Sequence, residues 1–325
     1  MQKESFHRAM KIVHERRNAA EAVAEQCRLE ISSKIPEINL LTNQLAQTCT
    51  EITRAVFSKK EEAQQAIKRL MQENLSAQGK IKQLLLQNGY PADYLVAKYT
   101  CSACSDTGYV DGTQCKCLKE LIVQQEIESF NAQNQISAVT FSQFDLSYYN
   151  SNARPQMERV LAFCKQYAER FSRNSVSVLM QGGVGLGKTH LSLSIASELM
   201  EKGYSVLYLS APDLFRKLQN EYYGKSESKT DTMDLIRAAD LVIIDDLGAE
   251  LENQFNSMAF YNIVNLRQNT MHPMIINTNF SFKEIEQRYS QRMMSRLLSF
   301  RCLKFTGNDI RQIKMRLQYG AAMES

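Results

Sequence analysis

Apolar residues recur three and four positions apart along the N-terminal part of the chain, which is the spacing of an amphipathic helix. One series runs through Ile38, Leu41, Leu45, Cys49, Ile52 and Val56, and a second through Ala63, Ile67, Leu70, Leu75, Ile81 and Leu85. Between Phe6 and about Gln87 there is almost no glycine and one proline, Pro36, before the stop signal Asn88-Gly89-Tyr90-Pro91. We expect two or three helices that pair or bundle, whose apolar stripe either forms their core or docks a partner.

From about Asn150 onwards the pattern changes, and short β-branched runs alternate with helical ones, as in a parallel α/β sheet. The expected strands are 176–181, 205–210, 241–245, 274–278 and 301–305. The glutamine-rich stretch before them has no strong apolar face and is expected to be a linker. The predicted order is a helical module (1–95), a cysteine segment (96–120), the linker (121–150) and the α/β domain (151–325).

Composition adds limits on compartment and partner. A chain of 325 residues is long enough for several folded units, and a formal charge of +4 is too mild by itself to indicate a polyanion partner. The N-terminus is charged where a signal peptide would be apolar, and no apolar run approaches the ~18 residues of a membrane span. We therefore expect a cytoplasmic protein without membrane contact.

A glycine-rich segment carries the first chemistry. Residues 182–189 read Gly-Gly-Val-Gly-Leu-Gly-Lys-Thr and match the P-loop pattern G-x-x-x-x-G-K-[ST], between an expected strand and an expected helix. Backbone N–H groups that point at phosphate oxygens would come from the loop around the glycines Gly182, Gly183, Gly185 and Gly187. Lys188 would reach the β- and γ-phosphates and the Thr189 hydroxyl would ligate Mg²⁺, so the pattern predicts an ATP site.

A second motif fits the first. The apolar run Leu241-Val242-Ile243-Ile244 ends in two carboxylates, Asp245 and Asp246, which is a Walker B pattern. Asp245 would hold Mg²⁺ through water and Asp246 would polarise the attacking water.

Four of the eight cysteines crowd into one short segment, as Cys101-x-x-Cys104 and Cys115-x-Cys117. Asp111-Gly112 between the pairs is a hairpin-turn signal, so a short ribbon would bring the four thiolates around one tetrahedral Zn²⁺. The C-x-C half departs from the usual C-x-x-C spacing. A structural zinc is favoured over redox or catalytic thiols, because four cysteines leave no coordination position for a substrate.

With the P-loop and Walker B in place, the chain resembles AAA+ ATPases, and Asp245-Asp246-Leu247-Gly248 is similar to the signature of the DnaC/DnaI and IstB branch. Asp246 is a departure, since this class usually has glutamate there, and its shorter arm is expected to slow hydrolysis. The segment 275–279 resembles the sensor 1 strand, which implies that Asn279 contacts the γ-phosphate or the lytic water.

The same resemblance assigns roles to arginines near the C-terminus. Arg296 matches the arginine finger, with Arg292 in reserve, and would act on the ATP of a neighbouring subunit, which implies self-association into an ATP-bridged oligomer. Arg311 resembles the sensor 2 contact made in cis. Ordinary surface charge is the alternative for both. The lid after the sensor 1 strand is abbreviated, as in this branch.

One further segment mixes aromatic and basic side chains, as proteins that bind single-stranded DNA do. Lys217, Tyr222, Tyr223 and Lys225 are the candidate DNA contacts as a group, although an ordinary amphipathic helix explains each one alone. The resemblance implies an ATP-dependent loader of the replicative DNA helicase onto single-stranded DNA, with the helical module gripping the helicase. The alternatives are an IstB-like transposition helper ATPase and a non-hydrolysing ATP switch that binds DNA.

Overall fold

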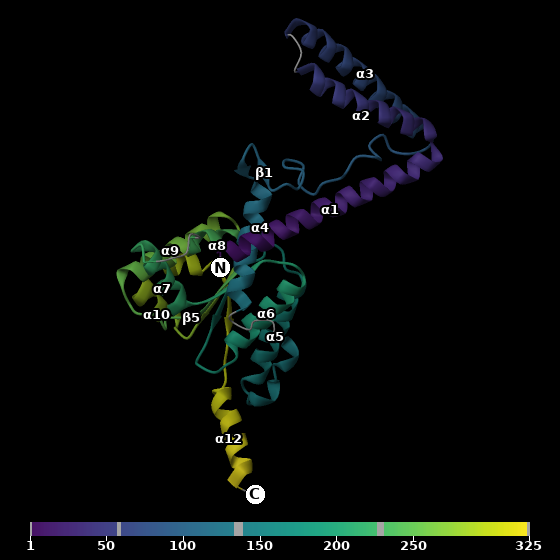
Figure 1. Cartoon of the computed structure of the whole chain (residues 1–325). Helices are drawn as coiled ribbons and strands as arrows, with labels where there is room; N and C mark the ends of the chain where they lie inside the picture. The colour runs from purple at the N-terminus through teal and green to yellow at the C-terminus, as the bar shows by residue number, and fades with distance from the viewer. Residues whose placement is uncertain (1, 57–59, 133–138, 226–230, 324–325) are drawn as a thin grey trace. The chain divides into compact units, whose positions relative to one another are not determined.

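The computed structural model describes residues 2–56, 60–132, 139–225 and 231–323 (Figure 1). The chain divides into two compact units, a helical unit of Met10–Leu118 and a sheet unit of Met1–Ala9 with Lys119–Ser325. Each unit has its own buried cluster of apolar side chains.

Three helices dominate the N-terminal part: α1 (Gln2–Lys34), α2 (Pro36–Val56) and α3 (Lys60–Gln87). Pro36 stands at the first position of α2, where its missing N–H costs no helical hydrogen bond. Ile31, Ile35 and Ile38 pack with Leu85 of α3 in the helical unit. The predicted helical module is thus confirmed, with three helices, and Cys49, Ile52, Val56, Ala63 and Ile67 fall where side chains are outside the described residues.

A small ribbon follows the helices. Strands β1 (Tyr109–Val110) and β2 (Thr113–Gln114) pair antiparallel around Asp111 and Gly112. Both turn residues have positive φ, 48° and 77°, as a two-residue type I′ hairpin turn requires. The Asp-Gly turn expected from the sequence is therefore present.

The sheet unit holds five parallel strands in the order β4-β5-β6-β3-β7. They are β3 (Val178–Gln181), β4 (Val206–Ser210), β5 (Leu241–Leu247), β6 (Met274–Thr278) and β7 (Arg301–Lys304). Each lies at an expected strand position, and β5 continues two residues beyond the expected end. The predicted parallel α/β sheet is confirmed.

Helices cover both faces of this sheet, which explains why its strands are apolar without alternation. On β5, Val242 and Ile244 face one buried cluster while Leu241 and Ile243 face the other. One face carries α5 (Arg154–Glu169) and α6 (Lys188–Glu201), and Figure 1 shows α7 and α9 on the other. That second layer comprises α7 (Ala211–Tyr222), α8 (Thr232–Ala238), α9 (Gln254–Asn269), α10 (Phe282–Tyr289) and α11 (Gln291–Leu297).

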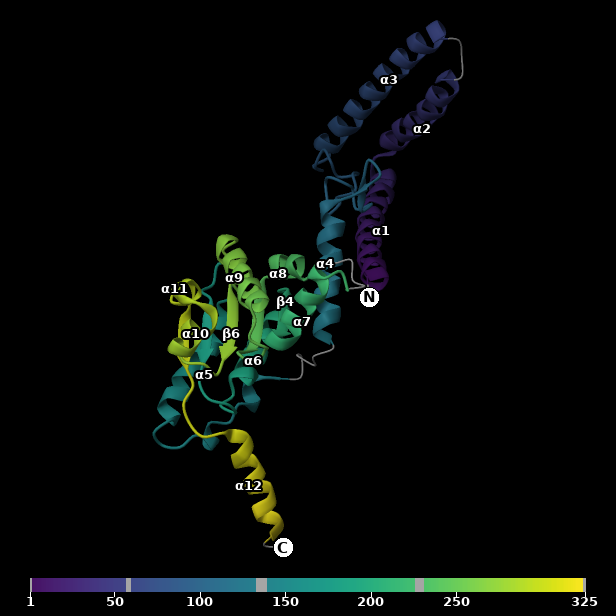
Figure 2. The ribbon, with the colours of Figure 1, turned by 90° about the vertical axis from the view of Figure 1, so that its left-hand side faces the viewer.

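After β7 the chain adds one helix, α12 (Ile310–Met323), which extends away from the rest of the sheet unit in both ribbon views (Figure 2). Its described side chains beyond Ile310 are mostly exposed. Among the described residues, α12 is thus the one helix that follows β7.

The sequence predicts a linker for 121–150, whereas much of this stretch is packed on the sheet unit. It contains most of α4 (Lys116–Ala132) and the 3-10 turns η2 (Phe141–Gln143) and η3 (Leu146–Tyr148). Ile127 joins the buried core, and the Asn131 side chain bonds edge strand β4 by donating to Val206 O and accepting from Tyr208 N. The polar side chain of Asn131 thus attaches α4 to the sheet, a role that apolar side chains usually have. Hydropathy alone therefore does not reveal this packing.

Candidate nucleotide and metal sites

The P-loop joins the end of β3 to the start of α6. Gly182 has φ +155°, and a Cβ there would lie 2.5 Å from the backbone oxygen of Phe305. Gly187 is left-handed at φ +86° and caps α6, and a Cβ there would lie 2.7 Å from the Phe144 ring. Glycine is therefore required at both positions. The N-terminus of α6 points its free N–H groups toward the loop, which is a ready anion site.

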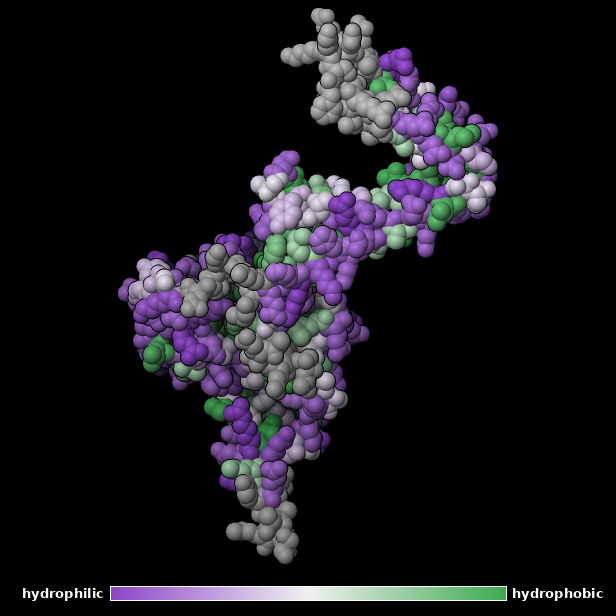
Figure 3. All heavy atoms as spheres, viewed as in Figure 1, coloured by the Kyte–Doolittle hydropathy of each residue, from purple (hydrophilic) through white to green (hydrophobic). Residues whose placement is uncertain are grey.

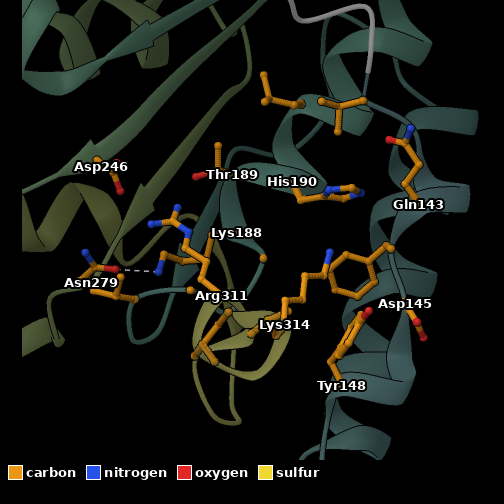
Figure 4. A pocket seen from close by; sticks show the side chains of 18 of the residues that line it. Gln143, Asp145, Tyr148, Lys188, Thr189, His190, Asp246, Asn279, Arg311 and Lys314 are labelled. Carbon is orange, nitrogen blue, oxygen red and sulfur yellow. Dashed lines mark hydrogen bonds between the residues drawn. The ribbon is translucent and has the colours of Figure 1, made fainter. Parts of the chain in front are cut away.

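Lys188 is held at the centre of this loop. Its Nζ donates to Asn279 Oδ1 at 2.7 Å (Figure 4), and it also donates to Gly182 O and Gly183 O, each at 2.7 Å. Desolvation lowers the pKa of Lys188, although Asp246 and Asp245 act in the opposite direction. The structure thus joins the P-loop lysine to the expected sensor 1 residue, a pair separated by 91 positions.

Asp245 is a buried acceptor of three side-chain hydrogen bonds. Thr189 Oγ1 donates at 3.1 Å, Asn277 Nδ2 at 2.7 Å and Tyr208 OH at 2.5 Å. The carboxylate and the Thr189 hydroxyl, the two expected Mg²⁺ contacts, are therefore adjacent. Asn277 lies below them in β6, bonded to Ser192 Oγ as well, so the structure gives Asn277 a supporting position and leaves Asn279 facing the cavity.

Asp246 differs from Asp245 in conformation and exposure. It has φ +54°, beside a register shift in the pairing of β5 with β6, and its side chain is exposed. A non-glycine residue at positive φ is held there against its usual preference, and such positions concentrate at functional sites. Desolvation and the adjacent Asp245 raise the pKa of Asp246 above its ordinary value.

These residues open onto a cavity of about 500 Å³. Figure 4 shows Asp246, Asn279 and Lys188 on one side and Gln143, Asp145 and Tyr148 on the other. The remaining lining residues are Val139, Phe144, Val184, Gly185, Leu186, Gly187, Thr189, His190, Leu193, Ala249, Ile310, Arg311 and Lys314. A volume of this size suits a nucleotide.

The far side of the cavity is aromatic, and sequence reasoning missed it. The rings of Phe144 and His190 lie 5.6 Å apart, and His190 Nε2 lies 3.1 Å from Thr140 O. Lys314 Nζ lies 5.1 Å from the centre of the Tyr148 ring. Flat apolar surfaces of this kind suit a nucleobase. The signal in the sequence was the run Thr140-Phe141-Ser142-Gln143-Phe144, whose aromatics are unusual for a linker.

The two expected phosphate-contacting arginines lie in different places. Arg311 lines the cavity with Lys188, at the start of α12 (Figure 4). Arg296 is not among the residues that line it, and its guanidinium donates to Gln268 Oε1 and Tyr261 OH, both at 2.9 Å. Arg292 is exposed. The structure therefore keeps Arg296 away from the cavity of its own chain, as an arginine that acts on a neighbour must be.

The four clustered cysteines come together in the helical unit. All four Sγ atoms lie within 4.8 Å of one another, with Cys101 and Cys115 at 3.9 Å and Cys104 and Cys117 at 3.5 Å. A Zn–S distance of about 2.3 Å in a tetrahedron gives S···S separations of about 3.8 Å, so the four thiols fit zinc.

Other groups support this cysteine cluster. Asp106 accepts from the N–H groups of Thr100 at 2.7 Å and Cys101 at 2.9 Å, which fixes the loop that bears the first pair. Burial raises the pKa of the Cys104 thiol, but hydrogen bonds from the Gly108 N–H and the neighbouring thiols outweigh it and bring the pKa to about 7. Burial and the same thiol contacts raise the pKa of the Cys117 thiol, so Cys104 is the member of this hydrogen-bonded pair that ionises first.

The expected DNA contacts do not form one cluster. Tyr222 and Tyr223 are 73% and 59% exposed with ring centres 5.2 Å apart, and exposed Lys225 follows them. Lys217 lies elsewhere on α7, with its Nζ 4.8 Å from the centre of the Phe130 ring. Two exposed rings beside a lysine are available to stack on bases, whereas Lys217 is engaged with Phe130.

Comparison with known proteins gives consistent matches. The family of IstB-like ATP binding proteins matches residues 106–315, which include every residue of the cavity. The replicative helicase loader DnaC of Escherichia coli (strain K12) is 28% identical over 149 residues, covering 46% of this chain and 60% of DnaC. The replicative helicase loader DnaI of Bacillus subtilis (strain 168) is 26% identical over 172 residues, covering 52% of this chain and 53% of DnaI.

Solved structures add a likeness to this comparison. A crystal structure of DnaI is 25% identical and covers 55% of this chain and 93% of that chain, with a TM-score of 0.45. The chain thus spans little more than half the length of the curated relatives it matches. In the part of the chain that the structure describes, no helix is both long and apolar enough to cross a membrane.

Proposed function

Since the chain belongs to the family of IstB-like ATP binding proteins and has the AAA+ P-loop fold, we propose that it is an ATP-dependent loader of the replicative DNA helicase onto single-stranded DNA during replication initiation. Its similarity to two proteins named replicative helicase loaders supports this function. The observation that carries it is that the family match contains the whole nucleotide cavity.

In this proposal the cavity binds ATP with Mg²⁺. The phosphates occupy the P-loop, and Lys188 exchanges its bonds to Gly182 and Gly183 for phosphate oxygens. Thr189 and Asp245 hold Mg²⁺, which would neutralise charge on the phosphates when bound. Arg311 makes a further phosphate contact from the same chain.

Hydrolysis needs a group that orients water, and we assign this role to Asp246. Its side chain lines the cavity from β5, and Asn279 is bonded to Lys188, the residue that would reach the γ-phosphate. Aspartate has a shorter arm than the glutamate that is usual at this position, so we expect hydrolysis to be slow and stimulated by DNA. Membership of the family supports ATP hydrolysis in general.

A neighbouring subunit would complete the site. Arg296 does not line its own cavity and is held by Gln268 and Tyr261, so we assign it to the ATP of a second copy in an oligomer. Single-stranded DNA would contact Tyr222, Tyr223 and Lys225, with Lys217 as the weakest member of the predicted group. The helical module, with Zn²⁺ held by its four clustered cysteines, would bind the helicase.

A loading assay tests the proposal. The purified replicative helicase of the source organism is mixed with circular single-stranded DNA coated with single-strand binding protein, and unwinding of an annealed strand is followed. We expect the chain with ATP to raise unwinding well above helicase alone, and Lys188→Ala to remove the gain. No gain from a chain that binds ATP and helicase would overturn the loader function.

One alternative stays open because the family is described as IstB-like, namely a helper ATPase in transposition that would bind duplex DNA and a transposase. Preference for duplex over single-stranded DNA, measured by fluorescence anisotropy, would support this alternative. The raised pKa and short arm of Asp246 favour another, an ATP switch without turnover. Measurable DNA-stimulated hydrolysis would exclude the switch.

A further inference from the structure

Helix α3 has a second face whose described apolar side chains are largely exposed. Its core face carries Leu70, Ala77 and Leu85, which are all buried. Met71, Leu75 and Leu86 are instead 58%, 68% and 61% exposed. At about 100° per residue these three side chains fall within roughly 60° of one another around the helix. Apolar side chains are visible at the surface of this unit among hydrophilic ones (Figure 3).

The exposed stripe is basic as well as apolar. Lys68 and Lys82 fall in the same arc, both exposed, and neither has an ion pair among the described residues. The one carboxylate in the described side chains of α3, Glu73, lies about 160° or more from the centre of the arc and pairs with Arg69. We call Lys68, Met71, Leu75, Lys82 and Leu86 the α3 stripe.

Gly79 supplies an independent observation at the edge of this stripe. Glycine weakens a helix interior, and a protein keeps it there for a turn, a positive φ or a close approach. Gly79 lies within α3, is exposed and has no positive φ, and a Cβ there would have nothing within 4 Å. Among the described residues, no neighbour therefore requires glycine at this position, whereas a partner backbone that approaches closely would.

Resting on the proposed function, we propose that the α3 stripe is where the partner helicase docks, through an amphipathic helix with apolar residues flanked by Asp or Glu. Lys68, Met71, Leu75 and Lys82 recur at three, four and seven positions, the spacing of a coiled-coil seam, which fits a helix. Unpaired lysines at seam positions select carboxylates on the partner. Gly79 lets the two backbones approach.

The test measures binding of the full chain to the purified replicative helicase by biolayer interferometry at low and high salt. We expect Leu75→Glu to weaken binding at least tenfold and Lys82→Glu to weaken it several-fold, most at low salt. Lys80→Glu is the matched control, because Lys80 is an exposed lysine on the opposite side of α3 and its reversal should change binding less than twofold.

Gly79→Ala separates docking from folding. Alanine favours helix, so this variant should unfold at a higher temperature by circular dichroism and yet bind the helicase several-fold more weakly. Misfolding cannot produce that combination. If Leu75→Glu and Lys82→Glu bind the helicase as tightly as the wild-type chain, the α3 stripe is not the docking site, but the proposed function stands. If the wild-type chain itself does not bind the helicase, both the docking site and the proposed function are overturned. Loss of self-association in light scattering, with helicase binding intact, would assign the stripe to a second copy and overturn the proposal.

Discussion

Asp245 shows how a single side chain can be oriented from several elements. Tyr208 on β4, Thr189 on α6 and Asn277 on β6 all donate to its two oxygens, so its rotamer is fixed before any ligand binds. The P-loop and the two aspartates could be predicted because each motif is contiguous in sequence. Tyr208 and Phe144 could not, because they are distant from both motifs in the sequence and only the fold brings them to the site.

Tyr208→Phe tests this orientation of the aspartate. The change keeps the ring and removes one hydrogen bond to a charged group, which contributes about 1.5 kcal/mol. We expect the Mg²⁺ concentration needed for half-maximal ATP affinity to rise about tenfold, while ATP affinity without Mg²⁺ stays the same. Tyr204→Phe, which removes a hydroxyl bonded to Phe171 O, is the control and should leave the Mg²⁺ requirement unchanged.

Asp246→Asn separates binding from turnover. The amide cannot polarise water as a carboxylate does, so we expect turnover to fall by about 10² or more with ATP affinity retained. Lys188→Ala should instead abolish tight ATP binding, because it removes the cation at the phosphates. Isothermal titration with a non-hydrolysed analogue, beside phosphate release, distinguishes them. Retention of ATP analogue affinity in Lys188→Ala would contradict the P-loop assignment.

At the scale of elements, hydropathy predicts the strands but not the packing of the segment expected to be a linker. β5 is buried on both faces and reads as an unbroken apolar run, which makes it recognisable. The segment 121–150 packs through single contacts such as Ile127 and the Asn131 amide, and through aromatics that close the cavity. Such contacts have no period in the sequence, so propensity cannot reveal them. The domain boundaries therefore stay a prediction at that segment.

The ribbon of β1 and β2 depends on its metal in our interpretation. Its strands are two residues long and exposed, too little to bury a core. We expect one zinc per chain by elemental analysis of protein purified without chelator. Removing it should lower the melting temperature of the helical unit and leave ATP affinity unchanged. Cys104→Ser should bind zinc at least tenfold more weakly, and a metal-free wild-type chain would contradict the assignment.

At the scale of the whole molecule, our proposal makes activity a property of an assembly, because Arg296 does not line the cavity of its own chain. We expect Arg296→Ala to keep the nucleotide affinity of the isolated chain and to reduce DNA-stimulated turnover by roughly 10³ or more. Mixing it with Asp246→Asn should restore some turnover, because one interface can take Arg296 from one parent and Asp246 from the other. No recovery in mixtures shown to co-assemble would mean that the arginine acts in cis or that Arg292 is the finger.

The bonds of the Asn131 amide to β4 have a consequence for aggregation. β4 is an outermost strand, and an uncovered outer strand offers its N–H and C=O groups to any other chain, which seeds edge-to-edge aggregation. Asn131 takes up two of those groups, at Val206 and Tyr208. A fragment of residues 151–325 should therefore scatter light on gentle warming sooner than one of residues 119–325, and Asn131→Ala in the longer fragment should reproduce much of that loss. Helix α4, part of which the sequence predicts to be a linker, would then protect the outer strand β4 from pairing with the sheet of another molecule.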